Sequence, residues 1–317
     1  MKHTLSEDAT VVDFGAHFYP EEIKEHLSFT GGGSHSDEYA GLDRMHDPET
    51  RIREMKAAGV DAQVNSITTF MGHDDADVVA ETNDALVEYV HEYDEFYGLA
   101  SLPTAAGGDV AAEEFERCID NGFNGVALNE THVSLTDEEM EPVYEVAEST
   151  GAPVFVHVPS LPYIDLRFNA TFGRERALQE SIAAVIHRGV YDRHPDVKMV
   201  WHHLGGNIAA MIGRIHLHLD EGRWPLQEDL KPFDEFKRQL EEFVYVDTSG
   251  FFGYSAPIRI ALEEFPSTQI LYATDYPGEP RGADELAAFI DAITGSANLN
   301  DAERILGANA LELMVNV

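Results

Sequence analysis

Short apolar runs alternate with longer helical patterns along almost the whole chain of 317 residues. The apolar runs have the length of buried β-strands and lie at residues 10–14, 62–67, 96–101, 125–128, 154–158, 198–202, 244–248 and 270–274. The helical patterns lie at residues 48–58, 76–93, 110–121, 137–150, 175–190, 207–219, 233–242 and 256–264, with two more at 284–292 and 301–314. Parallel strands need a helical crossover between them, so eight such units predict an α/β fold, the (β/α)8 TIM barrel.

An open, doubly wound sheet is the competing architecture for alternating strands and helices. Its mark is a glycine-rich phosphate loop directly after the first strand, and no such loop follows Phe14. A single barrel normally uses about 250 residues or more. We therefore expect residues 1–317 to form one barrel domain with a C-terminal helical extension. Long insertions follow the first and fifth strands, at about 19–46 and 159–173, which places them on the catalytic face of such a barrel.

The charge of the chain excludes some functions. The sequence has 21 basic and 58 acidic residues, a formal net charge of −37. Nucleic-acid binding needs a clustered positive face, which this chain lacks, and an anionic membrane surface would repel it. Only six basic residues are lysines and fifteen are arginines. This composition predicts a halophilic host, because about 1 M salt shortens the Debye length to roughly 3 Å and screens the self-repulsion.

Three features bear on where the protein works. The N-terminal sequence has no apolar signal segment, and no stretch approaches the roughly 18 apolar residues of a membrane span. Cys118 is the single cysteine, so no intrachain disulfide can form. We expect a soluble, cytoplasmic protein.

Polar residues follow four of the predicted strands at corresponding positions. They are His17, His157, His203 and Asp275. All strands of a parallel barrel end on the same face, so these side chains should converge there. Burying several imidazoles and a carboxylate without partners would cost several kcal/mol, and a divalent metal ion is the economical shared partner. Histidine and aspartate are suited to Zn²⁺, Fe²⁺ or Mn²⁺, and three protein ligands leave a position open for water or substrate.

The two adjacent histidines of the sixth strand receive different predictions. His203 is the candidate general acid or base, since an imidazole can move protons near neutral pH. Gly205 and Gly206 follow it and allow the chain to turn sharply. His202 should point to the opposite face of the strand, where packing is the expected role.

Several sequence segments in this order resemble the amidohydrolase-related family, the branch of the amidohydrolase superfamily that contains aminocarboxymuconate-semialdehyde decarboxylase and γ-resorcylate decarboxylase. The segments are residues 13–20 (DFGAHFYP), 96–103 (FYGLASLP), 154–159 (VFVHVP), 191–198 (YDRHPDVK), 203–206 (HLGG) and 271–277 (LYATDYP). The resemblance runs from about residue 11 to residue 314. It implies a (β/α)8 barrel with one catalytic metal ion, usually zinc or manganese, and dimers are common in the family.

By position, the resemblance makes His17, His157 and Asp275 the metal ligands and His203 the catalytic histidine, with Asp275 sharing in proton transfer. Zinc is our first choice, with manganese or iron as alternatives. One departure matters: the family's first strand usually reads Asp-x-His-x-His, and the first of these histidines is Gly15 here. Asp13 lies about 7 Å back along the strand, too far to replace it. Water or a substrate oxygen could fill the gap, or the metal could be weak or absent.

The predicted fourth strand has no lysine to carry a bridging carboxylate, which favours a mononuclear site. The leading hypothesis is therefore a non-oxidative decarboxylase (carboxy-lyase) or hydratase for a small unsaturated or aromatic carboxylic acid. One alternative is metal-dependent hydrolysis of a lactone or amide. Another is a ligand-binding barrel that lost catalysis with the histidine at position 15.

The substrate contacts are predicted from the residues after the strands. Arg167 is the first candidate to bind a substrate carboxylate, ahead of Arg44 and Arg281. Tyr163, Phe18 and Tyr276 are candidates for an apolar wall around the substrate. The expected partners are a small carboxylic acid and a second copy of the chain in a homodimer.

Overall fold

Eight parallel strands form the centre of the computed structural model, which describes residues 5–6, 8–23, 43–157, 168–220, 223–224 and 229–317. Each strand pairs in parallel with the next one along the chain, in the order β1 to β8. The strands are β1 (Val12–His17), β2 (Ala62–Ser66), β3 (Phe96–Ser101), β4 (Gly125–Asn129), β5 (Val154–His157), β6 (Met199–Trp201), β7 (Val244–Asp247) and β8 (Ile270–Leu271). The predicted parallel (β/α)8 barrel is confirmed.

The chain beyond β8 closes the barrel against β1. The backbone N–H groups of Phe14 and His17 donate to the carbonyls of Tyr272 and Tyr276, each over 2.8 Å. In the opposite direction, the N–H of Asp275 donates to the carbonyl of Gly15, also over 2.8 Å. This seam brings the end of β1 and the segment after β8 side by side, although some 260 residues separate them in the chain.

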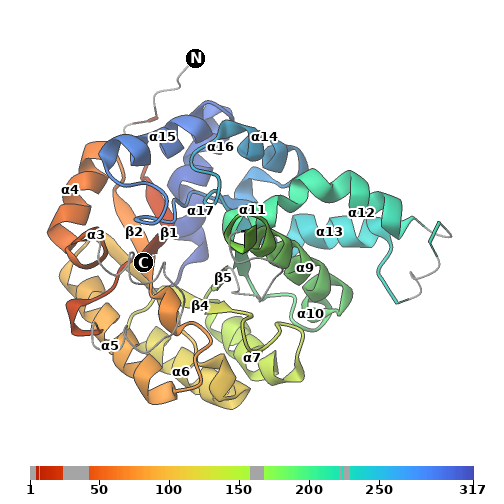
Figure 1. Cartoon of the computed structure of the whole chain (residues 1–317), viewed down its shortest axis with the longest axis horizontal. Helices are drawn as coiled ribbons and strands as arrows, with labels where there is room; N and C mark the ends of the chain where they lie inside the picture. The colour runs from red at the N-terminus through yellow and green to blue at the C-terminus, as the bar shows by residue number, and fades with distance from the viewer. Residues whose placement is uncertain (1–4, 7, 24–42, 158–167, 221–222, 225–228) are drawn as a thin grey trace.

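Helices surround the strands in the order expected of repeated βα units (Figure 1). The α-helices are α3 (Asp43–His46), α4 (Pro48–Ala58), α5 (Ala76–Glu92), α6 (Gly108–Asp120), α7 (Glu141–Thr150), α9 (Arg174–His187), α10 (Val190–Arg193), α11 (His202–Asn207), α12 (Ile212–Leu219), α13 (Phe233–Phe243), α14 (Ser255–Glu264), α15 (Ala283–Thr294), α16 (Leu299–Glu303) and α17 (Asn309–Leu313). Within the described residues, no helix combines the length and the apolar composition needed to cross a bilayer.

Short 3-10 and π turns extend or split several of these helices. They are Glu21–Ile23, Thr68–Phe70, Thr104–Ala106, Glu138–Met140, Asn169–Gly173, Ile208–Met211, Ser267–Gln269 and Arg304–Ala308. The single helix predicted at 301–314 is therefore wrong in detail, because a π turn separates α16 from α17. The first strand also ends later than predicted, at His17 instead of Phe14, so that this histidine belongs to the strand itself.

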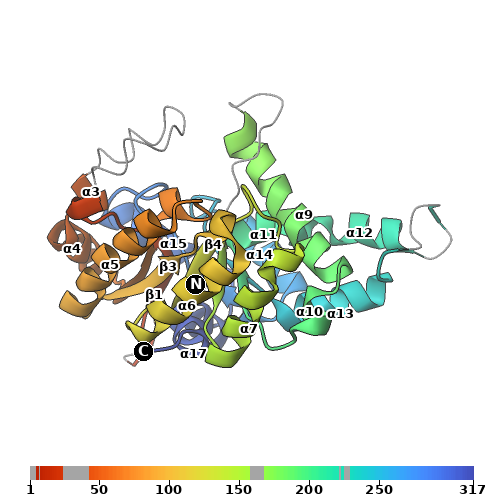
Figure 2. The same cartoon turned by 90° about the horizontal axis from the view of Figure 1, so that it is seen from below.

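Apolar side chains fill the barrel interior, and α17 closes one end of it. Phe14, Phe155 and Val200 belong to this inner cluster, which also includes Leu313 and Met314 from the C-terminal segment. Figure 2 shows α17 at the lower side of the barrel, below the strands. Because this end is packed, the polar chemistry of the barrel is restricted to the opposite end, where the strands finish.

Arg51 of α4 is a buried cation beneath that polar end. Its side chain has no exposed surface, and its guanidinium donates to the His17 carbonyl and, over 2.9 Å each, to Gln63 Oε1 and Asn65 Oδ1. Gln63 in turn donates to Asp13 over 3.0 Å, and burial raises the pKa of Asp13 to about 6. These hydrogen bonds tie α4 to β1 and β2 and fix the backbone from which His17 projects.

Replacing Arg51 with methionine should destabilise the fold. Arg51→Met keeps an apolar stem but leaves the oxygens of His17, Gln63 and Asn65 buried without their donor. Breaking a buried charge network in this way costs about 3–5 kcal/mol, so we expect a clear drop in the denaturant midpoint followed by circular dichroism. Arg53→Met on the same helix is the control, because Arg53 is exposed and should change stability by no more than about 0.5 kcal/mol. Equal midpoints for the two variants would contradict this role of Arg51.

Candidate metal centre

Four donor side chains meet where β1, β5, β6 and β8 finish. They are His17, His157, His202 and Asp275, and one ligand atom from each lies within 4.8 Å of the others. His17 Nε2 lies 2.8 Å from Asp275 Oδ1, and His202 Nε2 lies 3.9 Å from the same oxygen. The ring of His157 lies with its centroid 5.2 Å from that of His17 and 4.7 Å from that of His202. The structure therefore brings together all three residues predicted as ligands.

Hydrogen bonds on the far side of two imidazoles orient them toward the cluster. His17 Nδ1 lies 3.0 Å from Ser66 Oγ, and His202 Nδ1 lies 2.7 Å from Asp247 Oδ2. A carboxylate only accepts, so Nδ1 of His202 carries the proton and Nε2 has a free lone pair. That Nε2 is buried and has no hydrogen-bond partner among the described residues. This is the arrangement of metal-binding histidines, and the donor set fits one divalent ion.

The protonation states also suit metal binding. Burial holds the pKa of His157 and of His202 well below the ordinary value, and the charges of neighbouring histidines act in the same direction. Both imidazoles are therefore neutral near pH 7. Burial acts to raise the pKa of Asp275, but the hydrogen bond and charge of His17 outweigh it, and the pKa falls well below the usual range. The centre thus offers the neutral imidazoles of His157 and His202 and an ionised carboxylate.

His203 lies beside the cluster with a different partner. Its Nδ1 lies 2.7 Å from Glu175 Oε1, and its Nε2 lies 4.0 Å from Asp275 Oδ2. Burial acts to lower the pKa of His203, but the hydrogen bond and charge of Glu175, with the charge of Asp275, raise it above the ordinary value. The Glu175 carboxylate therefore favours the protonated form of His203. Such a group can donate a proton to a molecule held at the cluster.

A left-handed backbone turn begins at His203, two residues after the end of β6. Residues 203–207 all have positive φ, between 50° and 66°. A Cβ at Gly206 would lie 2.0 Å from the carbonyl oxygen of Glu175, so only glycine allows this close approach to α9. The approach places the Glu175 carboxylate next to His203. The sharp turn predicted from Gly205 and Gly206 is thus confirmed, and strain of this kind is concentrated at functional sites.

The prediction for His202 is wrong. Strand alternation allows only one of two adjacent histidines to face the barrel mouth. However, β6 ends at Trp201, and the left-handed turn that begins at His203 changes the direction of the chain there. Val200 faces the barrel interior, and His202 follows it two residues later on that same face. His202 therefore joins the donor cluster instead of packing outside it. The inward-facing position of Val200, two residues before His202, was the sequence signal that could have identified His202 as a donor.

Two acidic residues near the site also escaped the sequence analysis. Glu175 lies on α9, 28 residues before its partner His203, and no local pattern links the two. Glu279 follows β8 and forms a second group of potential ligands with His203 and Asp275. Burial and the charge of Asp275 raise the pKa of Glu279 to about 7. Both positions depend on how the loops fold back over the barrel.

The residues predicted to contact the substrate differ in where the structure places them. Tyr163 and Arg167 lie outside the described residues. Phe18 and Tyr276 have no exposed surface, and their rings pack on the guanidinium of Arg51, with centroids 5.3 and 4.8 Å from its central carbon. The structure gives them a packing role in place of the predicted substrate contact, because the buried Arg51 occupies one face of each ring.

The arginines near the barrel mouth differ in their partners. Arg44 forms an ion pair with Glu54 at 2.9 Å, and Arg281 is exposed. Arg174, the half-buried first residue of α9, was not singled out from the sequence. Its positive charge lowers the pKa of His157, His202 and His203, so it lies within electrostatic reach of the cluster.

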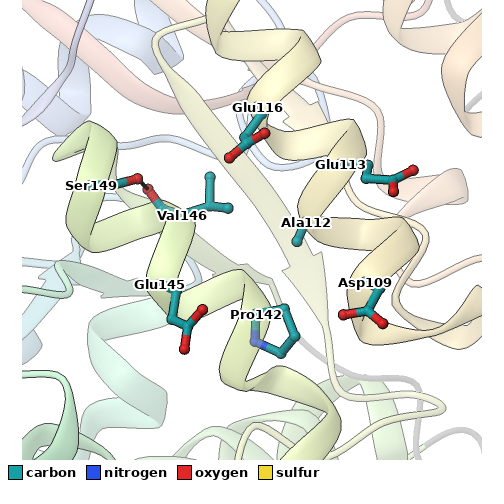
Figure 3. A pocket seen from close by; sticks show the side chains of 8 residues that line it. All are labelled: Asp109, Ala112, Glu113, Glu116, Pro142, Glu145, Val146 and Ser149. Carbon is teal, nitrogen blue, oxygen red and sulfur yellow. Dashed lines mark hydrogen bonds between the residues drawn. The ribbon is translucent and has the colours of Figure 1, made fainter.

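A hollow between α6 and α7 is a poor alternative site for an anionic substrate (Figure 3). Its lining residues are Asp109, Ala112, Glu113, Glu116, Pro142, Glu145, Val146 and Ser149. The four carboxylates among them are exposed, and the lining contains no basic side chain. This hollow would repel an organic acid.

A closed parallel barrel with histidines and an aspartate at its strand ends has the architecture of a metal-dependent barrel enzyme. The family model described as amidohydrolase matches residues 12–314, and the chain belongs to this family. The resemblance noted from the sequence motifs is thereby confirmed.

Similar proteins include decarboxylases. The 2-amino-3-carboxymuconate-6-semialdehyde decarboxylase of Dictyostelium discoideum is 28% identical over 84% of this chain and 76% of its own length. The γ-resorcylate decarboxylase of Rhodococcus jostii is 26% identical over 82% of this chain and 80% of its own length. The structure of 5-carboxyvanillate decarboxylase from Novosphingobium aromaticivorans, complexed with manganese and 4-hydroxy-3-methoxy-5-nitrobenzoic acid, has a TM-score of 0.82 at 21% identity. It covers 98% of this chain and 97% of its own, which supports the fold.

Removing the charge of Glu175 should lower the pKa of His203. Glu175→Gln takes away an anionic partner of the imidazolium, so the proton is held less tightly. We expect the titration of His203, followed by NMR of the selectively labelled, chelator-treated protein, to move to lower pH. Glu180→Gln on the exposed side of α9 is the matched control and should leave the titration unchanged. An unmoved titration in Glu175→Gln would show that the carboxylate does not control this proton.

Proposed function

We propose that the protein is a metal-dependent, non-oxidative carboxy-lyase that acts on a small aromatic or unsaturated carboxylic acid. The observation that carries the proposal is the pair of His203 and Glu175 beside a cluster of three histidines and an aspartate. A proton donor next to a site for a divalent ion is what decarboxylation needs. The decarboxylases among the similar proteins support the same reaction class.

His17, His157 and Asp275 are proposed to hold the metal ion. The ion would bind a substrate oxygen and stabilise the negative charge that develops on the substrate as the carboxylate departs. Zinc is the first choice from the sequence, and manganese and iron are the alternatives. Manganese is bound in a structure similar to this one.

His203 is proposed to supply the proton. Decarboxylation breaks a carbon–carbon bond, CO₂ leaves without the bonding electron pair, and that pair takes up a proton at the same carbon. The Nε2 atom of His203 has no hydrogen-bond partner among the described residues and is free to face the substrate. Glu175 keeps the imidazole protonated, and Asp275 Oδ2, 4.0 Å away, can share the proton.

A positive charge is needed to attract a carboxylate substrate to so acidic a chain. Arg174 is proposed to contribute it, because its field already reaches three histidines of the site. The roles of Arg167 and Tyr163 in substrate binding stay predictions.

Product analysis separates this function from its alternatives. Chelator-treated protein would be reloaded with Mn²⁺ or Zn²⁺ in high salt and incubated with 2,6-dihydroxybenzoate or 5-carboxyvanillate, the acids named for similar enzymes. CO₂ release matched by loss of the acid supports a carboxy-lyase. Ring opening of a lactone or cleavage of an amide, without CO₂ release, would favour the hydrolase. Metal uptake without turnover of any of these compounds would favour a ligand-binding barrel.

Replacing His203 with asparagine should abolish most of the activity without removing the metal. Asparagine tolerates the left-handed backbone at this position, where φ is 54°. We expect kcat to fall about 10²- to 10⁴-fold, which is the usual contribution of a positioned proton donor. The metal content measured by mass spectrometry should stay at the wild-type level. A variant with wild-type kcat would remove His203 from the mechanism.

Four expectations from the sequence form part of the proposal. The protein is expected to be cytoplasmic, to come from a halophilic organism, to form a homodimer, and to bind neither nucleic acid nor membranes. The net charge of −37 carries the second and the last of these.

The charge predicts that salt stabilises the fold. Raising KCl from about 0.1 to 1 M shortens the Debye length from about 10 to 3 Å, so carboxylates on neighbouring helices repel each other less. We expect the melting temperature to rise by several degrees or more. The variant Glu113→Gln/Glu116→Gln/Glu145→Gln removes three charges from the hollow in Figure 3 and should gain less from the same salt. A melting temperature that falls with KCl would contradict salt adaptation.

A further inference from the structure

The donor cluster contains a histidine from β6 that neither the sequence motifs nor the ligand roles proposed above require. His202 is fully buried, and its Nε2 faces His17, His157 and Asp275 without a hydrogen-bond partner in the described part of the chain. A buried imidazole nitrogen left unpaired is costly, so its orientation needs a reason. A bound cation in the cluster would provide one.

The other side of the His202 ring is held firmly. Asp247 Oδ2 lies 2.7 Å from Nδ1, and Ser249 Oγ lies 3.0 Å from it. Asp247 is itself fixed by the backbone N–H groups of His203 and Ser249, at 3.1 and 3.0 Å. A carboxylate that orients a histidine in this way is typical of the support behind a metal ligand.

The space around Gly15 explains why a donor from β6 belongs here. A Cβ built on Gly15 would lie 2.9 Å from Ala273 Cβ, 3.4 Å from Asp247 Oδ2 and 3.8 Å from His202 Cε1. Any side chain at position 15 would therefore have to displace Ala273, and it would start in van der Waals contact with Asp247 and with the ring of His202. We expect a histidine at position 15 to compete with His202 for the same space.

We infer that His202 is a metal ligand that replaces the one lost at Gly15, so that a donor from β1 has been exchanged for a donor from β6. The inference rests on the metal site of the proposed function and extends its ligand set to His17, His157, His202 and Asp275. Asp247 acts as a positioning residue for His202. In this ligand set, His202 would supply the donor that is missing at position 15, and neither water nor substrate would be needed to replace it.

Metal affinity provides the first test. His202→Asn keeps a nitrogen close to the place of Nδ1, where it can still donate to Asp247, but removes Nε2. Chelator-treated proteins would be titrated with Mn²⁺ and the free ion followed by electron paramagnetic resonance. We expect one equivalent bound by the wild type and a Kd raised about 100-fold or more in His202→Asn, as in His157→Asn. Asp247→Asn should raise Kd about 10- to 100-fold.

His194→Gln is the matched control for these titrations. His194 is also buried, but its two nitrogens contact Glu141 and Glu148 on the outer helices. The Kd of the His194→Gln variant for Mn²⁺ should equal that of the wild type. A His202→Asn variant with the same Kd as His194→Gln would overturn the inference.

The exchange of positions can also be reversed by design. Gly15→His/Ala273→Gly/His202→Ser moves the donor back to β1, and the Ala273→Gly change removes the 2.9 Å contact. We expect this triple variant to bind Mn²⁺ at least tenfold more tightly than His202→Ser alone. Gly15→His/Ala273→Gly with His202 still present should gain no affinity, because the two imidazoles compete for one volume. A gain in affinity with His202 present would contradict the exchange.

A measurement on the wild-type protein covers the case in which variants fail to fold. Pulsed electron paramagnetic resonance of bound Mn²⁺ counts the coordinated imidazole nitrogens, and we expect three. A count of two would overturn the inference. The outcome is independent of the reaction: three nitrogens without CO₂ release would reject the proposed function alone. CO₂ release with a count of two would reject the ligand alone.

Discussion

The site depends on the contacts that the carboxylate of Asp275 makes with three histidines. It lies 2.8 Å from His17 Nε2, 3.9 Å from His202 Nε2 and 4.0 Å from His203 Nε2. Asp275 has a left-handed backbone and lies within the hydrogen-bonded seam that joins the segment after β8 to β1. The closure of the barrel and the assembly of the site are therefore one event, because the seam that completes the sheet also delivers the central anion.

The position of Asp275 is reinforced from below the site. Asp13 accepts hydrogen bonds from the backbone N–H and the hydroxyl of Thr274, at 3.0 and 2.6 Å. Gln63 links Asp13 to the buried Arg51, which also holds the carbonyl of His17. The geometry of the strand ends is thus maintained by a buried polar layer between the apolar interior and the donor cluster. Such layers are expensive to bury unless every member is paired, which restricts how the residues above them can move.

Much of the fold followed from the sequence because its main signal is local. Strand-length apolar runs and helical spacing are patterns that extend over ten to twenty residues. Eight repeated strand–helix units are compatible with few architectures. The rule that parallel strands end on one face then located His17, His157 and Asp275. The same reasoning failed at His202, because alternation lets only one of two adjacent histidines face the site, whereas the left-handed turn that begins at His203 brings both of them there.

The remaining differences come from long-range packing. Glu175 meets His203 because glycine at 206 lets two backbones approach, and neither residue carries a mark of this in its own segment. Phe18 and Tyr276 follow strands and so resembled substrate contacts, but they pack on Arg51, a cation buried on α4. Buried charges of this kind are rare, and sequence rules based on average burial therefore miss them.

The coordination number of the ion connects the ligand set to the chemistry. Three protein donors on a tetrahedral ion leave one position open, whereas four donors fill it. With His202 in the set, an ion that also binds substrate must accept a fifth or sixth ligand. Mn²⁺ accommodates octahedral coordination readily, while Zn²⁺ prefers four ligands and expands to five only in some steps. As a ligand, the added histidine would therefore favour manganese over zinc, our first choice from the sequence. It does so without adding charge, since a neutral imidazole leaves Asp275 as the single anion among the four donors and keeps the centre attractive to an acidic substrate.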